Sequence, residues 1–153
     1  MTSWQLAEIN IGELRAPLAD PAMHDFVAAL AEVSERSTQA PGFVWKGGLL
    51  PIGDDAEIIA GYLGSPDWLV QLSVWESVDA LKAFVYRDDT HATAYRRRAE
   101  WFVPAGERSY ALWWVAAGHC PTHDEAFGRL ACLREGGPSR EAFTFARTFG
   151  ANE

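Results

Sequence analysis

The stretch from 67 to 75 (DWLVQLSVW) constrains the fold more than any other part of this sequence. Side chains alternate between the two sides of a β-strand, and here the even-numbered positions are all apolar. The odd-numbered positions mix Leu69 and Trp75 with Gln71 and Ser73. A strand with two usable faces predicts a sheet that is covered on both sides.

Local patterns predict the remaining elements along the chain. Strands are expected at 3–11, 43–50 (with a break at Gly47-Gly48) and 108–117. Helices are expected at 20–36, from Ser77 onward, at 90–102, and from the capping box at 122–125 to the glycines at 136–137. Residues 51–66 read mostly as loop with a short strand at 58–61, and the aromatic tail 139–149 is expected to dock as a short strand on a sheet edge.

The order strand, helix, strand, strand, helix, strand is that of a ferredoxin-like sandwich. This is an α+β fold with four antiparallel strands and helices on one face. Residues 1–153 are therefore predicted to form a single domain of this kind, with an extra helix and a C-terminal appendage. The second sheet face still shows large apolar side chains, and a homodimer that packs sheet on sheet is the simplest way to bury them.

Composition and charge exclude several classes of protein. The formal net charge of −8 argues against a nucleic-acid partner, because such binding depends on neutralising phosphates. The apolar runs fall far short of the roughly 20 residues of a membrane-spanning helix, and the N-terminus has no signal-peptide pattern, so a cytoplasmic location is expected. Cys120 and Cys132 are expected to be reduced, and no cysteine or histidine cluster has the spacing of a zinc site.

The predicted helix at 90–102 (THATAYRRRAEWF) carries an unusual polar stripe. At about 100° per residue, His91, Tyr95, Arg98 and Phe102 fall on one line along the helix. The opposite face is an ordinary charged surface, so the polar stripe is expected to face inward, where apolar residues are the rule. Two interpretations stay open: a polar wall of a small-molecule cavity, or a helix whose long side chains cover the core edge while His91 is structural.

The turn at 119–123 offers a second candidate site. His119 and His123 flank Cys120, which suggests a metal site or an activated thiol. Adjacent residues in a turn usually point apart, and helix capping explains Thr122 and Glu125 without catalysis. A structural turn is the favoured interpretation, and no metal site is predicted here.

Several motifs together resemble one known family. They are SVWES at 73–77, FVYRDDTH at 84–91, RRRAEWF at 96–102, LWWVAAGHCPT at 112–122 and GPSREAFTF at 137–145. Over residues 3–147 the chain resembles the domain of unknown function 3291 family (DUF3291). More distantly it is similar to the dimeric α+β-barrel superfamily, which includes antibiotic-biosynthesis monooxygenases, haem-degrading monooxygenases, chlorite dismutase relatives and muconolactone isomerase-like enzymes. The resemblance implies a fold and a homodimer, while one fold hosts many reactions.

The cofactor-independent members of that superfamily act on aromatic or polyketide-like substrates held between sheet and helices. The resemblance therefore implies oxygenase-, isomerase- or cyclase-like chemistry without a cofactor. His91 is the expected general acid/base, Arg98 the group that stabilises a developing oxyanion, and Tyr95 a group that orients the substrate. The expected substrate-binding residues are Asn10, Ser73, Trp75, Trp101 and Trp114.

Two other functions are kept open. In haem-binding members of the superfamily a helical histidine is the axial ligand of the iron, and His91 is the position that matches it. Alternatively, the chain is a non-catalytic protein that binds a small molecule or has a purely structural role. An enzyme should keep its fold but lose turnover when His91 or Arg98 is replaced by Ala, whereas a structural role of these residues would show as lost stability.

Overall fold

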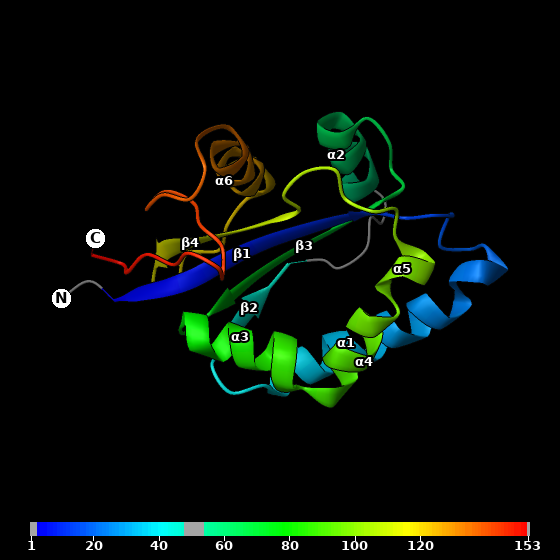
Figure 1. Cartoon of the computed structure of the whole chain (residues 1–153), viewed down its shortest axis with the longest axis horizontal. Helices are drawn as coiled ribbons and strands as arrows, with labels where there is room; N and C mark the ends of the chain where they lie inside the picture. The colour runs from blue at the N-terminus through cyan, green and yellow to red at the C-terminus, as the bar shows by residue number, and fades with distance from the viewer. Residues whose placement is uncertain (1–2, 48–53, 153) are drawn as a thin grey trace.

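Four antiparallel strands form one sheet in the order β2-β3-β1-β4 (Figure 1). The computed structural model describes residues 3–47 and 54–152, and its strands are β1 (Trp4–Glu13), β2 (Phe43–Lys46), β3 (Trp68–Trp75) and β4 (Tyr110–Ala116). Strand β1 lies in the centre, paired with β3 on one side and β4 on the other. The predicted ferredoxin-like α+β fold is confirmed. The predicted break at Gly47-Gly48 and the end of the predicted second strand fall partly on 48–50, outside the described residues.

One side of the sheet faces four α-helices, α1 (His24–Gln39), α3 (Val78–Arg87), α4 (Asp89–Arg96) and α5 (Arg98–Trp101) (Figure 1). A short 3-10 helix, η1 (Pro21–Met23), leads into α1, and the Asp20 side chain accepts a hydrogen bond from the backbone N–H of Ala22. Ser77 caps α3 in the same way, by accepting from the backbone N–H of Ala80. Both caps follow from the sequence, since Asp and Ser are preferred at these positions.

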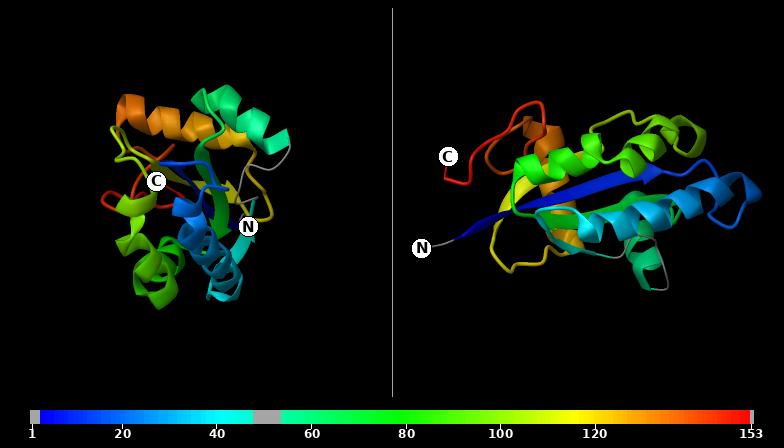
Figure 2. Two further views of the ribbon diagram at one scale, coloured as in Figure 1. Left: turned by 90° about the vertical axis from the view of Figure 1, so that its right-hand side faces the viewer. Right: turned by 90° about the horizontal axis from the view of Figure 1, so that it is seen from below.

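The opposite side of the sheet lies under α2 (Asp54–Leu63) and α6 (His123–Gly136) (Figure 2). Ile59 of α2 and Leu130 of α6 belong to the same buried cluster as Val70, Leu72 and Trp113 of the sheet. Helices thus cover both faces, and the argument for a dimer from an uncovered face is wrong because this chain's own helices bury it. The homodimer itself stays a prediction.

Helix α2 corrects the expectation of a loop with a short strand at 58–61. Ile59 is buried, and Tyr62 stacks on Phe127 of α6 with ring centroids 4.2 Å apart. Helical spacing places Ile59 and Leu63 on one face, which packs on the sheet core. The segment is helical because this face finds a tertiary partner, which local sequence patterns do not reveal.

The single helix predicted at 90–102 is two helices, α4 and α5. Arg97 separates them with φ −91° and ψ 3°. Its guanidinium pairs with Glu100 at 2.8 Å and with Asp25 of α1 at 3.1 Å. The break redirects the chain after α4, so the polar stripe does not continue along one axis.

The C-terminal tail docks on the outer edge of β4 as predicted, but through a bridge at Phe143 and not as a short strand. Phe143 exchanges two backbone hydrogen bonds with Leu112, each 2.9 Å long. The Phe143 side chain is fully buried. None of the helices in the described ranges has the length and hydropathy of a membrane-spanning segment.

Candidate functional site

The middle of the sheet face below α3 and α4 is polar. On β1 it carries Glu8 and Asn10, whose neighbours in the ladder are Ser73 and Gln71 on β3. On the other side Asn10 is aligned with Tyr110 of β4. All of these except Glu8 are only half-buried, although helices lie over this side of the sheet. The mixed strand faces therefore do look toward the helix that carries His91.

Glu8 is the most unusual group of this polar patch. Its side chain is buried, with the residue 7% exposed, and Oε1 accepts a hydrogen bond of 2.5 Å from Nδ2 of Asn10. Oε2 is also buried and has no hydrogen-bond partner among the described residues. Burial raises the pKa of the Glu8 carboxyl to about 7, against the opposing effect of the Asn10 hydrogen bond. At neutral pH the carboxyl is thus about half protonated.

Apolar rows close the polar patch at both ends. At one end Leu6 and Trp75 are aligned in the ladder and pack with Phe84 of α3. At the other end the Phe102 ring lies over Gly12, so closely that a Cβ there would come within 2.6 Å of it. Glycine is required at this position because any side chain would collide with the ring. The polar groups are therefore confined to the centre of the face.

His91 lies at the start of α4, where Asp88 fixes the helix. One oxygen of Asp88 accepts a hydrogen bond from the His91 backbone N–H at 3.1 Å, and the other pairs with Arg36 of α1 at 2.9 Å. The His91 ring places Nδ1 2.9 Å from the carbonyl oxygen of Val85. Because a carbonyl only accepts, Nδ1 carries the proton and Nε2 keeps its lone pair.

Burial sets the charge of His91. It lowers the pKa of the imidazole, and the hydrogen bond to Val85 and the charge of Asp88 oppose this effect. The ring is therefore neutral at physiological pH. A neutral imidazole with a free Nε2 is the form that accepts a proton.

His91, Tyr95 and Arg98 do come together, but as a stack that leads outward. The Arg98 guanidinium lies 4.0 Å from the centre of the Tyr95 ring. The Tyr95 ring in turn stacks on the His91 ring, with the two ring centroids 6.5 Å apart. Tyr95 is 47% exposed and Arg98 is exposed. The expected inward orientation of the whole stripe is wrong for Tyr95 and Arg98, because α4 ends before Arg98, whereas His91 and Phe102 are turned inside.

Tyr86 links the helix side to the sheet side. Burial raises the pKa of its hydroxyl, and Tyr110, Tyr95 and Glu8 raise it further through electrostatic repulsion. Tyr86 is itself 54% exposed, so solvent screens these interactions. The ring of Phe145 in the tail packs against the rings of both Tyr86 and Tyr110, with centroid distances of 5.8 and 5.6 Å.

The predicted tryptophans lie in different places. Trp75 is fully buried beside the patch, donates to Oγ of Ser73 at 3.0 Å, and stacks on Phe84, which in turn contacts His91 edge-on. Trp114 donates to the carbonyl oxygen of Phe149 and so holds the tail.

Trp101 belongs to a separate cluster, with Phe26 of α1. Of the five predicted substrate-binding residues, the structure brings Asn10, Ser73 and Trp75 together with the Glu8 patch. Trp114 lies on the same sheet face, aligned with Leu6 of β1 and packed against the cluster that contains Trp75, whereas Trp101 lies apart.

Sequence reasoning missed Glu8, Tyr86 and Tyr110. A usable signal for Glu8 was its position on a central strand, two residues after Leu6 on the same face, where a charged residue is rare. Tyr86 and Tyr110 gave no such signal, since a tyrosine at an element boundary is common. Their grouping depends on the tail residue Phe145, far away in the sequence.

The turn before α6 is structural in its contacts. Glu125 receives a hydrogen bond from the indole of Trp113 at 2.9 Å, and its other oxygen lies 2.6 Å from Nε2 of His119. Thr122 caps α6 by accepting from the Glu125 backbone N–H. Cys120 and Cys132 are free thiols. Within the described residues no group of histidine, cysteine and carboxylate side chains is arranged to hold a metal ion.

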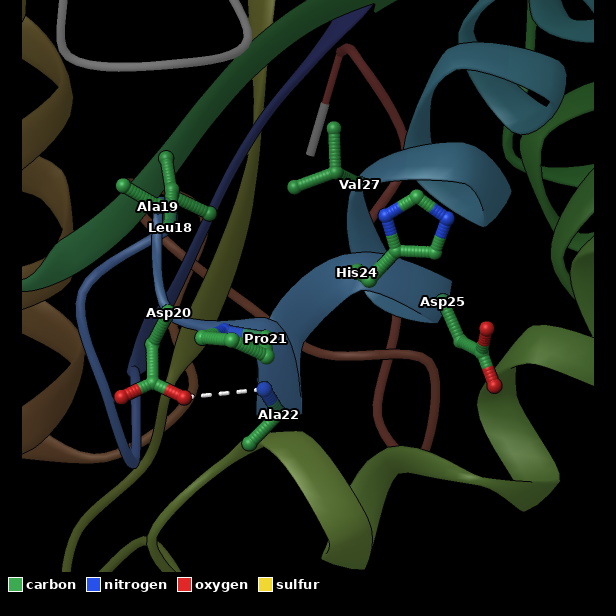
Figure 3. A pocket seen from close by; sticks show the side chains of 8 residues that line it. All are labelled: Leu18, Ala19, Asp20, Pro21, Ala22, His24, Asp25 and Val27. Atoms are coloured by element: carbon green, nitrogen blue, oxygen red, sulfur yellow. Dashed lines mark hydrogen bonds between the residues drawn. The ribbon is translucent and has the colours of Figure 1, made fainter.

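Two open depressions lie away from the Glu8 patch. One, of about 600 Å³, surrounds the start of α1 and is lined by Asp20, His24 and Val27 among others (Figure 3). The other, of about 510 Å³, runs between α1 and α4 and includes Thr93 and Trp101. Figure 3 shows mostly short and apolar side chains around Asp20, whose carboxylate is already used as a helix cap. Neither depression offers a free catalytic pair.

Comparison with known proteins places this arrangement in a family. Residues 5–153 match the model of a family described as a domain of unknown function, DUF3291. This chain belongs to the DUF3291 family. No curated protein matches the DUF3291 chain in sequence.

Solved structures of similar fold share little sequence with the DUF3291 chain. Rv0793 of Mycobacterium tuberculosis is 16% identical, with 77% of this chain and 99% of that one covered and a TM-score of 0.50. A variant of SnoaB, a cofactor-independent oxygenase from Streptomyces nogalater, is 15% identical, with 76% and 95% covered and a TM-score of 0.48. A protein of Nitrosomonas europaea, provisionally named an antibiotic biosynthesis monooxygenase, is 13% identical, with 78% and 92% covered and a TM-score of 0.49. At this identity the likeness to Rv0793 shows the fold alone.

Proposed function

We propose that this DUF3291 chain is an enzyme that acts by proton transfer on a small aromatic or polyketide-like molecule, without a resident cofactor. The observation that carries the proposal is the His91 ring, held in one tautomer by Val85 on the side of the sheet that carries the polar patch. A neutral, oriented imidazole in a partly buried setting is suited to general acid/base catalysis. The reaction class is oxygenase-, isomerase- or cyclase-like.

The proposed chemistry starts at Nε2 of His91. Nε2 takes a proton from a substrate carbon or hydroxyl next to a carbonyl, which leaves an enolate or phenolate and an imidazolium. The carbanion is then protonated at another atom, attacks a second carbon of the same molecule, or reacts with dioxygen. These three outcomes correspond to isomerase, cyclase and oxygenase reactions.

Other residues have supporting roles in this proposal. The Asn10 amide and the Ser73 hydroxyl orient the substrate from the sheet, and Trp75 supplies an apolar end. Tyr95 and Arg98 act at the exposed side, where the stacked guanidinium attracts and stabilises an anionic oxygen. Trp101 and Trp114 stay predicted binding residues, although the contacts they make in the structure are with this chain's own core and tail.

The proposal is tested with a probe that has an acidic C–H next to a carbonyl, 1,8-dihydroxyanthrone, kept free of oxygen in D2O. Proton NMR follows the exchange of its methylene protons. We expect the protein to accelerate exchange and His91→Gln to lose about 10²-fold of that acceleration, the lower end of what general acid/base groups contribute. His24→Gln, at the exposed start of α1, is the matched control and should change nothing. Equal exchange rates for wild type and His91→Gln would contradict the proposal, and binding without exchange would favour a non-catalytic module.

Haem stays the alternative prediction, with His91 as the ligand. The hydrogen bond from Nδ1 to Val85 is one that a ligating histidine also uses. The surroundings fit a porphyrin poorly, because Phe84 and Tyr95 flank the ring and the sheet below carries a buried carboxyl with a free oxygen. Titration with hemin should therefore give no stoichiometric Soret band that depends on His91, and such a band would favour haem.

A further inference from the structure

We propose that Glu8 is a second catalytic residue of this site, which donates a hydrogen bond from Oε2 to the substrate oxygen on which negative charge develops. The inference rests on the proposed function and deepens it. It assigns a substrate class: small molecules with a carbonyl or phenol oxygen beside the position that His91 deprotonates. Amines and other cations are not part of this class, because the proposed role of Glu8 is to donate from its neutral form.

The geometry around Glu8 points to a missing partner. Glu8 lies on the central strand β1, between Ser73 on one side and Leu112 on the other. One carboxyl oxygen is held by Asn10, and the other is buried without a partner among the described residues. Buried polar atoms are almost always paired, and an unpaired one is costly for the fold. A ligand oxygen at Oε2 provides the pairing that the residues around it lack.

The hydrogen bond from Asn10 decides which oxygen carries the proton. An amide N–H only donates, so the Glu8 oxygen that receives it is the acceptor, Oε1. In the neutral acid the proton is then on Oε2, which points to the unpaired side. When His91 removes a proton from the substrate, the charge that develops on the substrate oxygen is stabilised by this O–H, or the proton passes to it and leaves a carboxylate and an enol. Both outcomes conserve protons and need no further reactant.

Burial and the Asn10 hydrogen bond set how the charge of Glu8 responds to pH. Other titratable groups lie on the same side of the sheet. On the sheet they are Lys46 of β2, whose ladder partner is Ser73, and Tyr110 of β4. The helices contribute Tyr86 of α3 and the stacked pair His91 and Tyr95 of α4. Lys46 is already bonded to the hydroxyl and carbonyl of Ser34 in α1. None of these groups forms a hydrogen bond with Glu8. Because burial raises its pKa, the Glu8 carboxyl is neutral at low pH and ionises as pH rises through neutrality.

The test uses 1,8-dihydroxyanthraquinone, a stable analogue that has the carbonyl and phenol oxygens but no acidic methylene. Its dissociation constant is measured by absorbance below and above neutral pH. Wild type should bind more weakly at the higher pH, because ionised Glu8 repels the ligand oxygen. Glu8→Leu should bind about tenfold more weakly than wild type at low pH, as expected for a lost hydrogen bond. Glu8→Gln keeps an N–H donor and does not titrate, so it should bind as wild type does at low pH, at both pH values.

Glu13→Gln is the control, because Glu13 is the exposed end of the same strand. Unchanged binding in Glu8→Leu, or a Glu8→Gln variant that keeps the pH dependence of wild type, would overturn the inference. Circular dichroism confirms that each variant is folded, and the Gln variant is informative even when the Leu variant is not. The two proposals can fail separately. If exchange activity depends on His91 but ligand binding does not depend on Glu8, the proposed function stands and this inference is wrong. If binding depends on Glu8 but exchange does not depend on His91, Glu8 is a ligand-binding group and His91 is not the base.

Discussion

In the proposed mechanism, burial prepares Glu8 and His91 for opposite roles in proton transfer. Burial favours the neutral form of both, which makes the carboxyl a donor and the imidazole an acceptor. Two titratable groups with perturbed pKa values on one side of a sheet are typical of functional sites. The single hydrogen bonds from Asn10 and to Val85 set which atom of each group is left for the substrate.

The raised pKa of Glu8 predicts a loss of stability with rising pH. The folded protein binds this proton up to about pH 7, whereas the unfolded chain releases it near the ordinary value of 4.5. The contribution of Glu8 to stability is therefore complete below pH 4.5 and is lost as pH rises through about 7, and the loss amounts to about 3 kcal/mol. Glu8→Gln should remove this loss and be the more stable protein at pH above 7.

Urea unfolding at several pH values measures that difference. His91 contributes with the opposite sign, since its lowered pKa reduces stability as pH falls below 6.5, but it is common to both proteins and cancels. Glu13→Gln should follow wild type throughout. A wild-type protein that is as stable as Glu8→Gln above pH 7 would show that Glu8 is not buried as described.

The sequence identified His91, Tyr95 and Arg98 as a group but misjudged how they lie. Helical periodicity gave their common stripe, and the structure does stack them. Periodicity has no information on where a helix ends, as α4 does at Arg97. Glu8 was visible only as part of a mixed strand face, because the absence of a partner for one oxygen is a property of the packed sheet.

At the scale of elements, the position of α4 depends on its first residues. Asp88 makes two contacts: it caps α4 by accepting a hydrogen bond from the backbone N–H of His91, and it forms an ion pair with Arg36 of α1. A cap of this kind stabilises the helix end and fixes the direction in which the chain leaves α3. The orientation of the His91 ring is thus set by the cap and by Val85 together.

Replacement of Asp88 tests this role. Asp88→Ala should lower the free energy of unfolding by about 1–2 kcal/mol, because it removes both the cap and the ion pair. Asp88→Asn keeps a capping oxygen and should lose less than about 1 kcal/mol. Exchange activity should fall in the Ala variant and largely survive in the Asn variant. Asp79→Ala, an exposed position in the first turn of α3, serves as control for a general loss of helix charge.

The elements themselves were predictable to different degrees. Strands β1, β3 and β4 and the caps of η1, α3 and α6 follow from alternation and from single capping residues. Helix α2 was not predicted, because its apolar face is short and makes sense only against Phe127 of α6 and the sheet.

At the scale of the whole molecule, the two sheet faces have different tasks. The face under α2 and α6 is an apolar core, whereas the face under α3 and α4 keeps polar groups at its centre (Figure 1). The strand at 67–75 already predicted coverage on both sides. The sequence predicted a second copy of the chain over the second face, whereas α2 and α6 cover it. Both solutions bury apolar residues equally well, so the pattern of the strand does not distinguish them. The predicted homodimer would therefore use a different surface from the one first inferred.

The most direct test of this account is a crystal structure of the protein with 1,8-dihydroxyanthraquinone. We predict that the ring system lies between the polar face of β1 and β3 and the helices α3 and α4. One ligand oxygen should be within hydrogen-bonding distance of Oε2 of Glu8, with Nε2 of His91 facing the neighbouring ring carbon. A ligand bound instead in the depression at the start of α1 (Figure 3) or between α1 and α4, with Glu8 and His91 untouched, would contradict the account.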